Sequence, residues 1–221
     1  VTPLTEQLVS QIGVGGVVYL ASSTPDPATT RALSQSLQAL AAARSPGVPL
    51  FVAVDHEGGR VVRFRSGVTV FPDPMAIAAT NDPELATRAA RASAAELRFA
   101  GINLLLGPLL DVNSDPANPV IGTRAFGDDP ARVAEFALAY LRGLRDGGLV
   151  AVGKHFPGHG GVDVDSHAAL PVIPKDAAAL WAQDLLPFRA AIAAGLPAVM
   201  TGHLAVPALD PSGAPASLSP A

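Results

Sequence analysis

The sequence has no cysteine and few aromatic residues, which make up 5% of its 221 positions. Without cysteine, the chain can form no disulfide bond, no thiolate metal site and no cysteine nucleophile. Its 15 Lys and Arg residues are outnumbered by 19 Asp and Glu residues and form no basic run. The electrostatic signature of nucleic-acid binding is therefore missing. No apolar run reaches the roughly 18 residues of a membrane-spanning helix, so we expect neither nucleic-acid binding nor a membrane span.

The hydrophobic content of 49% is enough for a globular core. Short and nearly continuous apolar runs recur along the chain, and such runs are typical of parallel strands that are buried on both faces. The predicted strands cover residues 16–20, 50–54, 102–106, 150–155 and 198–202.

Segments of helical character separate the predicted strands. Asn81 and Asp129 stand where a helix N-cap is expected. The alternation of strand and helix predicts βα units around a parallel sheet, which is an α/β fold. The predicted helices cover residues 29–44, 83–100, 129–146 and 177–194.

Two architectures fit this alternation, a doubly wound open sheet and a (β/α)8 TIM barrel. A doubly wound sheet often has a glycine-rich phosphate loop after its first strand, and residues 20–27 (LASSTPDP) do not form one. A barrel gathers its functional residues at the carboxyl ends of many strands. Polar residues end or follow four of the five predicted strands, at 55–57, 108–111, 154–155 and 201–203. We therefore predict a TIM barrel, and an incomplete one because five strands cannot close it.

Residues 154–167 read KHFPGHGGVDVDSH and hold three of the five histidines. One interpretation is a metal site, since His155 and His159 have the four-residue spacing of helical metal ligands. Pro157 and Gly158 lie between them and disfavour a helix. A second interpretation is a polar loop of turn residues, although so many histidines are unusual in one. We predict no metal.

An acid/base device is the third interpretation and fits best. In an extended segment, side chains two residues apart point to the same side, so Asp165 can face His167. A carboxylate that holds the proton of one ring nitrogen fixes the tautomer and raises the basicity of the other nitrogen. The result is a proton donor and acceptor that works near neutral pH. Lys154 and His155 stand at a strand end and suit hydrogen bonding to a ligand.

Two further segments carry charges with two interpretations each. Asp55 closes a predicted buried strand, where an unpaired charge is costly, and Arg63 follows eight residues later. They form either an ion pair or a carboxylate and a cation that grip one ligand. Arg124 is the only cation of the long polar segment 111–129, and long loops in compact domains are often functional. It forms either a surface salt bridge or a ligand contact.

Together these motifs resemble glycoside hydrolase family 3, and within it the β-N-acetylglucosaminidase branch. The resemblance covers nearly the whole chain and is most specific at KHFPGHG…DSH, because the DSH histidine separates this branch from the rest of the family. The other matching stretches are VDHEGGRVVRF (54–64), GTRAF (122–126), MTGH (200–203) and LDPSGAPASLSP (209–220).

The resemblance implies that His167 is the general acid/base and that Asp165 is its orienting partner. It implies a double displacement with retention, in which an aspartate attacks the anomeric carbon and water then releases the sugar. No metal or organic cofactor is implied. The residues that match the family's N-acetylglucosamine-binding positions are Asp55, Arg63, Arg124, Lys154 and His155.

The family's nucleophile is an aspartate on the strand after the one that ends near His203, and the family's first strand precedes the strand at 16–20. Neither has a counterpart in these 221 residues. We therefore interpret residues 1–221 as part of one family 3 N-terminal TIM-barrel domain, covering about strands two to six.

The expected protein is an exo-acting, retaining β-N-acetylglucosaminidase that removes terminal β-linked N-acetylglucosamine, with peptidoglycan fragments as the expected substrates. We expect a monomer. One alternative is a phosphorylase, because a neutral histidine base does not repel phosphate. Another is a sugar-binding fragment without catalysis. Family members occur in the cytoplasm and as exported or lipid-anchored proteins, so the resemblance assigns no compartment.

Overall fold

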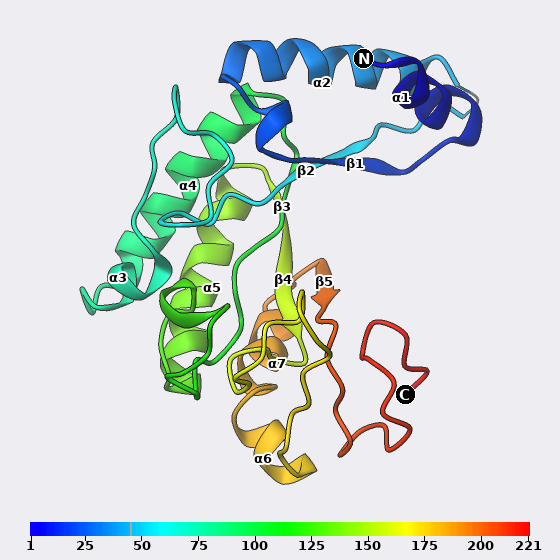
Figure 1. Cartoon of the computed structure of the whole chain (residues 1–221). Coiled ribbons are helices and arrows are strands. Elements are labelled where there is room, and N and C mark those ends of the chain that lie inside the picture. Colours follow the sequence, from blue (N-terminus) through cyan, green and yellow to red (C-terminus); the bar gives the residue numbers. More distant parts are fainter. Residues whose placement is uncertain (45) are drawn as a thin grey trace.

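Five parallel strands form one sheet, in the order β1-β2-β3-β4-β5. The computed structural model describes residues 1–44 and 46–221. Each strand pairs with the next one along the chain, and the sheet curls from β1 to β5 (Figure 1). The strands are β1 (Gly16–Tyr19), β2 (Phe51–Val54), β3 (Leu104–Leu105), β4 (Val150–Phe156) and β5 (Ala198–Thr201).

All five predicted strands are confirmed, and so is the α/β class with a parallel sheet that forms part of a barrel. The prediction that the strands are buried on both faces is wrong for the two edges. β2 and β4 have neighbours on both sides and are largely buried. Among residues 1–44 and 46–221, β1 and β5 pair on one side only, and Val18 and Val199 on them are exposed.

Four of the helices begin with the dipeptide Asp-Pro. Proline suits the first helical position because its ring fixes φ and the missing N–H would be unpaired there, while aspartate is a favoured N-cap. In α2, α4 and α5 the aspartate accepts a backbone hydrogen bond from the first turn. The helices are α1 (Pro3–Gln7), α2 (Pro27–Ala42), α3 (Pro74–Ala78), α4 (Pro83–Phe99), α5 (Pro130–Asp146), α6 (Ala177–Ala182) and α7 (Leu186–Ala193); the short helices η1 (Leu8–Ile12), η2 (Ala21–Ser23) and η3 (Gly122–Arg124) complete the set.

Two helix predictions need correction. The predicted helix 177–194 is broken into α6 and α7, because Pro187 opens α7 and cannot continue a helix that contains the carbonyl of Gln183. The N-cap of α4 is Asp82 instead of Asn81, whose φ of 57° lies in the left-handed region. Asp129 caps α5 as predicted.

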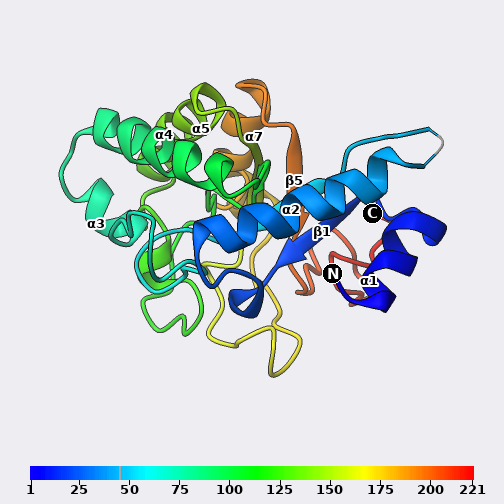
Figure 2. The same cartoon turned by 90° about the horizontal axis from the view of Figure 1, so that it is seen from above.

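α4, α5 and α7 lie side by side along the sheet (Figures 1 and 2). Gly143 of α5 allows a close approach to α4, since a β-carbon there would lie 2.2 Å from the carbonyl oxygen of Thr87. In the described residues, no helix is long and apolar enough to cross a bilayer. The core between helices and sheet includes Val52, Val54, Leu97, Phe136, Leu144, Ala151 and Phe188.

Candidate active site

A network of paired charges lies at the carboxyl ends of β2 and β4. Asp55 directly follows β2, and Lys154 lies on β4. The Nζ atom of Lys154 is 2.6 Å from Oδ1 of Asp55 and 2.6 Å from Oε1 of Glu57. The Lys154 side chain is 2% exposed. A buried charge is costly unless it is paired, and these two carboxylates provide the pairing. Arg63 joins the network, with its Nη2 atom 3.4 Å from Oδ2 of Asp55.

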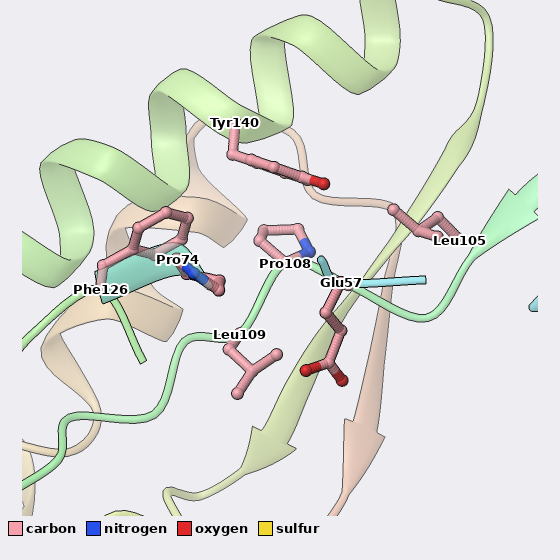
Figure 3. A pocket seen from close by; sticks show the side chains of 8 residues that line it. Glu57, Pro74, Leu105, Pro108, Leu109, Phe126 and Tyr140 are labelled. Atoms are coloured by element: carbon pink, nitrogen blue, oxygen red, sulfur yellow. The ribbon is translucent and has the colours of Figure 1, made fainter. Parts of the chain in front are cut away.

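Glu57 also binds Arg124, which η3 brings from the long loop before α5. Both distances of this two-pronged pair, from Nε and Nη2 to the carboxylate oxygens, are 2.9 Å. Burial raises the pKa of Glu57, but the hydrogen bonds from Arg124 and the charge of Lys154 outweigh it and hold that pKa below its usual value. The Glu57 carboxylate points away from Tyr140, Pro108 and Leu105, which line an apolar pocket beside it (Figure 3).

Asp111 orients the histidine at the end of β4. It is fully buried, and its Oδ2 atom lies 2.7 Å from Nδ1 of His155, while Oδ1 accepts the backbone N–H of His159 at 2.7 Å. Burial raises the pKa of Asp111, but the charge and hydrogen bonds of His155 lower it by more. The net result is a pKa below the usual value. An ionised Asp111 keeps a proton on Nδ1 of His155, so the Nε2 of a neutral ring is a hydrogen-bond acceptor.

Asp165 and His167 are in contact on the segment after β4. Oδ1 of Asp165 lies 2.7 Å from Nδ1 of His167 and accepts the backbone N–H of the same residue at 2.8 Å. These hydrogen bonds, the backbone bond first, lower the pKa of Asp165. The side chain of His167 is 85% exposed, and that of Asp165 is 43% exposed. This dyad is thus held by its own segment and is open to solvent.

One cavity of about 370 Å³ connects these groups, within the range of small-molecule sites. The structure brings five of the predicted site residues and His167 to its wall, whereas Asp165 contacts His167 without lining the cavity. His203, after β5, also lies on the wall, and its Nδ1 is 2.7 Å from Oγ of Ser217. The charged and histidine side chains of the wall are Asp55, Glu57, Arg63, Arg124, Lys154, His155, His159, His167 and His203.

The sequence patterns did not single out Glu57 and Asp111 as site residues, and they considered His159 only as a metal ligand. Glu57 stands two residues after Asp55, so the spacing argument that pairs Asp165 with His167 would have found it. Asp111 follows the third predicted strand and is one of the polar residues used to choose the barrel. In the described part of the chain, His159 is buried with both ring nitrogens lacking a hydrogen-bond partner, and burial lowers its pKa.

His155 and His159, the two histidines of the metal interpretation, lie side by side in the structure. Their ring centroids lie 6.0 Å apart at an interplanar angle of 71°, and His155 is already bonded to Asp111. Among residues 1–44 and 46–221, no three His, Asp or Glu side chains are arranged to hold a metal ion.

The buried His56, which lies beside the site, should make the stability of the fold depend on pH. It is 3% exposed, and its Nδ1 accepts the backbone N–H of Arg63 at 3.3 Å. Burial, opposed by Glu96 and aided by Arg63, lowers its pKa from 6.5 to about 4. The unfolded chain therefore binds a proton at His56 more readily than the folded protein does. The folded protein loses stability relative to the unfolded chain as the pH falls from 6.5 towards 4. We expect a decrease of about 3 kcal/mol in the free energy of unfolding, measured by urea denaturation.

His56→Asn is the matched variant, because its amide oxygen can accept the Arg63 N–H but does not titrate. We expect the loss of stability between pH 6.5 and 4 to shrink by half or more, with His159 supplying a remainder of the same sign. An unchanged slope in this window would show that His56 is not its source.

The whole chain is similar to one protein family. The family model for the glycosyl hydrolase family 3 N-terminal domain matches residues 3–221. A β-hexosaminidase from Nitrosomonas eutropha is 41% identical over an alignment of 220 positions that covers 96% of this chain and 62% of that protein. β-Hexosaminidase A from Pseudoalteromonas piscicida is 40% identical over an alignment of 215 positions that covers 95% of this chain and 36% of that protein.

Solved structures agree with this similarity. A glycoside hydrolase family 3 β-N-acetylglucosaminidase from Paenibacillus sp. strain FPU-7 superposes with a TM-score of 0.96 at 44% identity, covering 99% of this chain and 41% of that one. NagZ from Neisseria gonorrhoeae, in complex with N-trifluoroacetyl-D-glucosamine, gives 0.90 at 36% identity, covering 99% and 64%. The chain thus spans between about a third and two thirds of the length of these relatives.

Proposed function

The chain belongs to glycosyl hydrolase family 3, and on that premise we propose that the protein is an exo-acting, retaining β-N-acetylglucosaminidase. The observation that carries the proposal is the shared cavity, in which a buried charge network and the His167 side chain face the same space. The solved relatives described as β-N-acetylglucosaminidase and as a complex with N-trifluoroacetyl-D-glucosamine support the substrate class. We propose terminal β-linked N-acetylglucosamine of peptidoglycan fragments as the substrate.

In this proposal the charge network holds the sugar ring. Sugar hydroxyls both donate and accept hydrogen bonds, and a wall that alternates carboxylates with cations offers both partners. The pairing also sets each group in place before the sugar arrives, which reduces the entropy cost of binding. The residues proposed to bind the N-acetylglucosamine ring are Asp55, Arg63, Arg124, Lys154 and His155.

His167 is the proposed acid/base, with Asp165 as its orienting partner. Protonated His167 gives its proton to the glycosidic oxygen while an aspartate carboxylate attacks the anomeric carbon, and the bond to the leaving group breaks. Neutral His167 then takes a proton from water as the water oxygen attacks the same carbon and releases the carboxylate. Two inversions at one carbon retain the β configuration.

The attacking aspartate is proposed to lie outside these 221 residues, as the family resemblance implies. The aspartates nearest the cavity have other partners. Asp55 binds Lys154 and Arg63, Asp111 is buried against His155, and Asp165 binds His167. A carboxylate engaged in this way is a poor nucleophile.

The test is an assay of the full-length protein with 4-nitrophenyl N-acetyl-β-glucosaminide, with and without phosphate. We expect nitrophenol release that does not depend on phosphate, with the β anomer as the first sugar product by NMR. The β-hexosaminidase names of the relatives favour this outcome. Release that requires phosphate would identify a phosphorylase. Sugar binding without release would leave a binding protein, and either result would overturn the proposal.

Asp55→Asn tests the sugar-binding role separately from catalysis. The amide keeps the shape of the carboxylate but loses its charge, and hydrogen bonds to charged groups contribute about 1.5–3 kcal/mol. We expect the affinity for N-acetylglucosamine to fall about 10- to 100-fold in calorimetric titration. Asp129→Asn is the matched control, because asparagine caps a helix as well as aspartate does and Asp129 caps α5 away from the cavity. Equal affinities in the wild type, Asp55→Asn and Asp129→Asn would mean that Asp55 serves only as a structural ion-pair partner.

A further inference from the structure

Asn118 is a buried amide with every hydrogen-bonding position filled. It is 7% exposed. Its Nδ2 donates to the carbonyl oxygens of His159 at 2.8 Å and Val162 at 2.7 Å. Its Oδ1 accepts the backbone N–H groups of Val120 at 2.9 Å and Ile121 at 2.7 Å. Two donors and two acceptor positions are the full capacity of an asparagine side chain, so Asn118 joins two loops that are about 40 residues apart in sequence.

The acceptor half of Asn118 supports the loop that carries Arg124. The carbonyl oxygen of Val120 accepts a hydrogen bond from Nη1 of Arg124 at 3.1 Å. The same arginine pairs with Glu57, and Glu57 pairs with Lys154. Asn118 is therefore two hydrogen bonds away from the buried charge network.

The donor half of Asn118 holds the start of the segment that carries His167. Val162 is buried in a small apolar cluster with Ile173 and Leu180, whereas His167, five residues later, is 85% exposed. Gly160 lets the two loops meet backbone to backbone, because a β-carbon there would lie 1.9 Å from the carbonyl oxygen of Val112. The bonds from Asn118 thus fix the segment at the point where it leaves the packed interior.

We propose that Asn118 is a positioning residue that fixes the acid/base segment relative to the sugar held by Arg124. This inference rests on the proposed function. Asn118 does not line the cavity and acts through the two loops it joins. Proton transfer to a leaving group requires heavy-atom distances near 3 Å, and a displacement of about 1 Å caused by a remote substitution can reduce a rate 10²-fold. A loose connection between these loops therefore weakens acid catalysis more than sugar binding.

Asn118→Asp separates the two halves of the side chain. One carboxylate oxygen keeps the bonds from Val120 and Ile121, and the other faces two carbonyl oxygens that it repels. For an aryl β-N-acetylglucosaminide with a poor leaving group, we expect kcat/KM to fall about 10- to 100-fold. For the 2,4-dinitrophenyl substrate, which needs little protonation, we expect a change below about threefold. The affinity for N-acetylglucosamine should also change less than about threefold.

The readout is the slope of log kcat/KM against the leaving-group pKa, because this slope does not depend on the fraction of active protein. Asn103→Asp is the matched control. The Asn103 side chain bonds to the backbone of Leu50 and Val52. These residues lie at the amino ends of β2 and β3, whereas the candidate site lies at the carboxyl ends of the strands. We expect a steeper slope for Asn118→Asp alone. If that variant does not fold, Asn118→Ser, which keeps one hydroxyl at this position, is expected to give an intermediate slope.

The outcomes separate this inference from the proposed function. A wild-type protein that cleaves none of the aryl N-acetylglucosaminides overturns both. A wild-type protein that cleaves them, together with a slope that is unchanged in the Asn118 variants or equally steep in Asn103→Asp, overturns only the positioning role.

Discussion

His167→Ala in the full-length protein is expected to slow the turnover of 4-nitrophenyl N-acetyl-β-glucosaminide by about 10²-fold or more, the usual contribution of a general acid/base. Alanine removes the proton donor of the first step and the proton acceptor of the second. The side chain is 85% exposed and, within the part of the chain that the structure describes, bonds to Asp165, so its removal should leave the fold intact. The assay is initial-rate kinetics, with thermal unfolding as the check on folding.

A loss of rate alone would not assign the role, so the pH profile is the second measurement. The limb of the wild-type profile that follows the acid/base should disappear in His167→Ala, and azide should restore turnover because a small anion can attack the glycosyl-enzyme without a general base. Turnover within threefold of wild type, with the same pH profile, would remove His167 from the mechanism.

The strands were predictable because each of them is a local apolar run. The edges differ for a reason that local sequence does not contain: burial of a strand depends on its neighbours, and β1 and β5 each have one neighbouring strand in the described part of the chain. The break between α6 and α7 was signalled by Pro187. The pairing of buried Asp184 with Lys175, at 2.7 Å, also lies at this break and could not be read from the helical pattern.

The residues that line the candidate site were predictable where a family motif names them, and unpredictable where a long-range contact brings them there. Glu57 contacts Arg124 across 67 positions, and Asn118 contacts His159 across 41. In the sequence, Glu57 and Asn118 look like ordinary polar loop residues. What they contact follows from the fold, because buried polar groups need partners and those partners come from other strands and loops.

Glu57→Gln is expected to destabilise the fold by about 3–5 kcal/mol, the range for breaking a buried ion pair on one side. In the wild type, Lys154, Arg124 and Arg63 face two carboxylates, Asp55 and Glu57. The variant keeps the size of the side chain but leaves three cations around one carboxylate. Urea denaturation at pH 7 measures the difference. Glu135→Gln, on the exposed side of α5, is the matched control and should change stability by less than about 0.5 kcal/mol.

The pH dependence and a second substitution show whether charge is the cause. Because the pKa of Glu57 is lowered from 4.5, its contribution is complete above pH 4.5 and is lost as the pH falls through the lowered value. The gap between wild type and Glu57→Gln should therefore narrow in acid. Adding Lys154→Met removes one of the uncompensated cations, so the double variant should be more stable than the sum of the two single losses predicts. Strict additivity, with a gap that does not change with pH, would mean that Glu57 acts by packing and that the charge network does not organise this site.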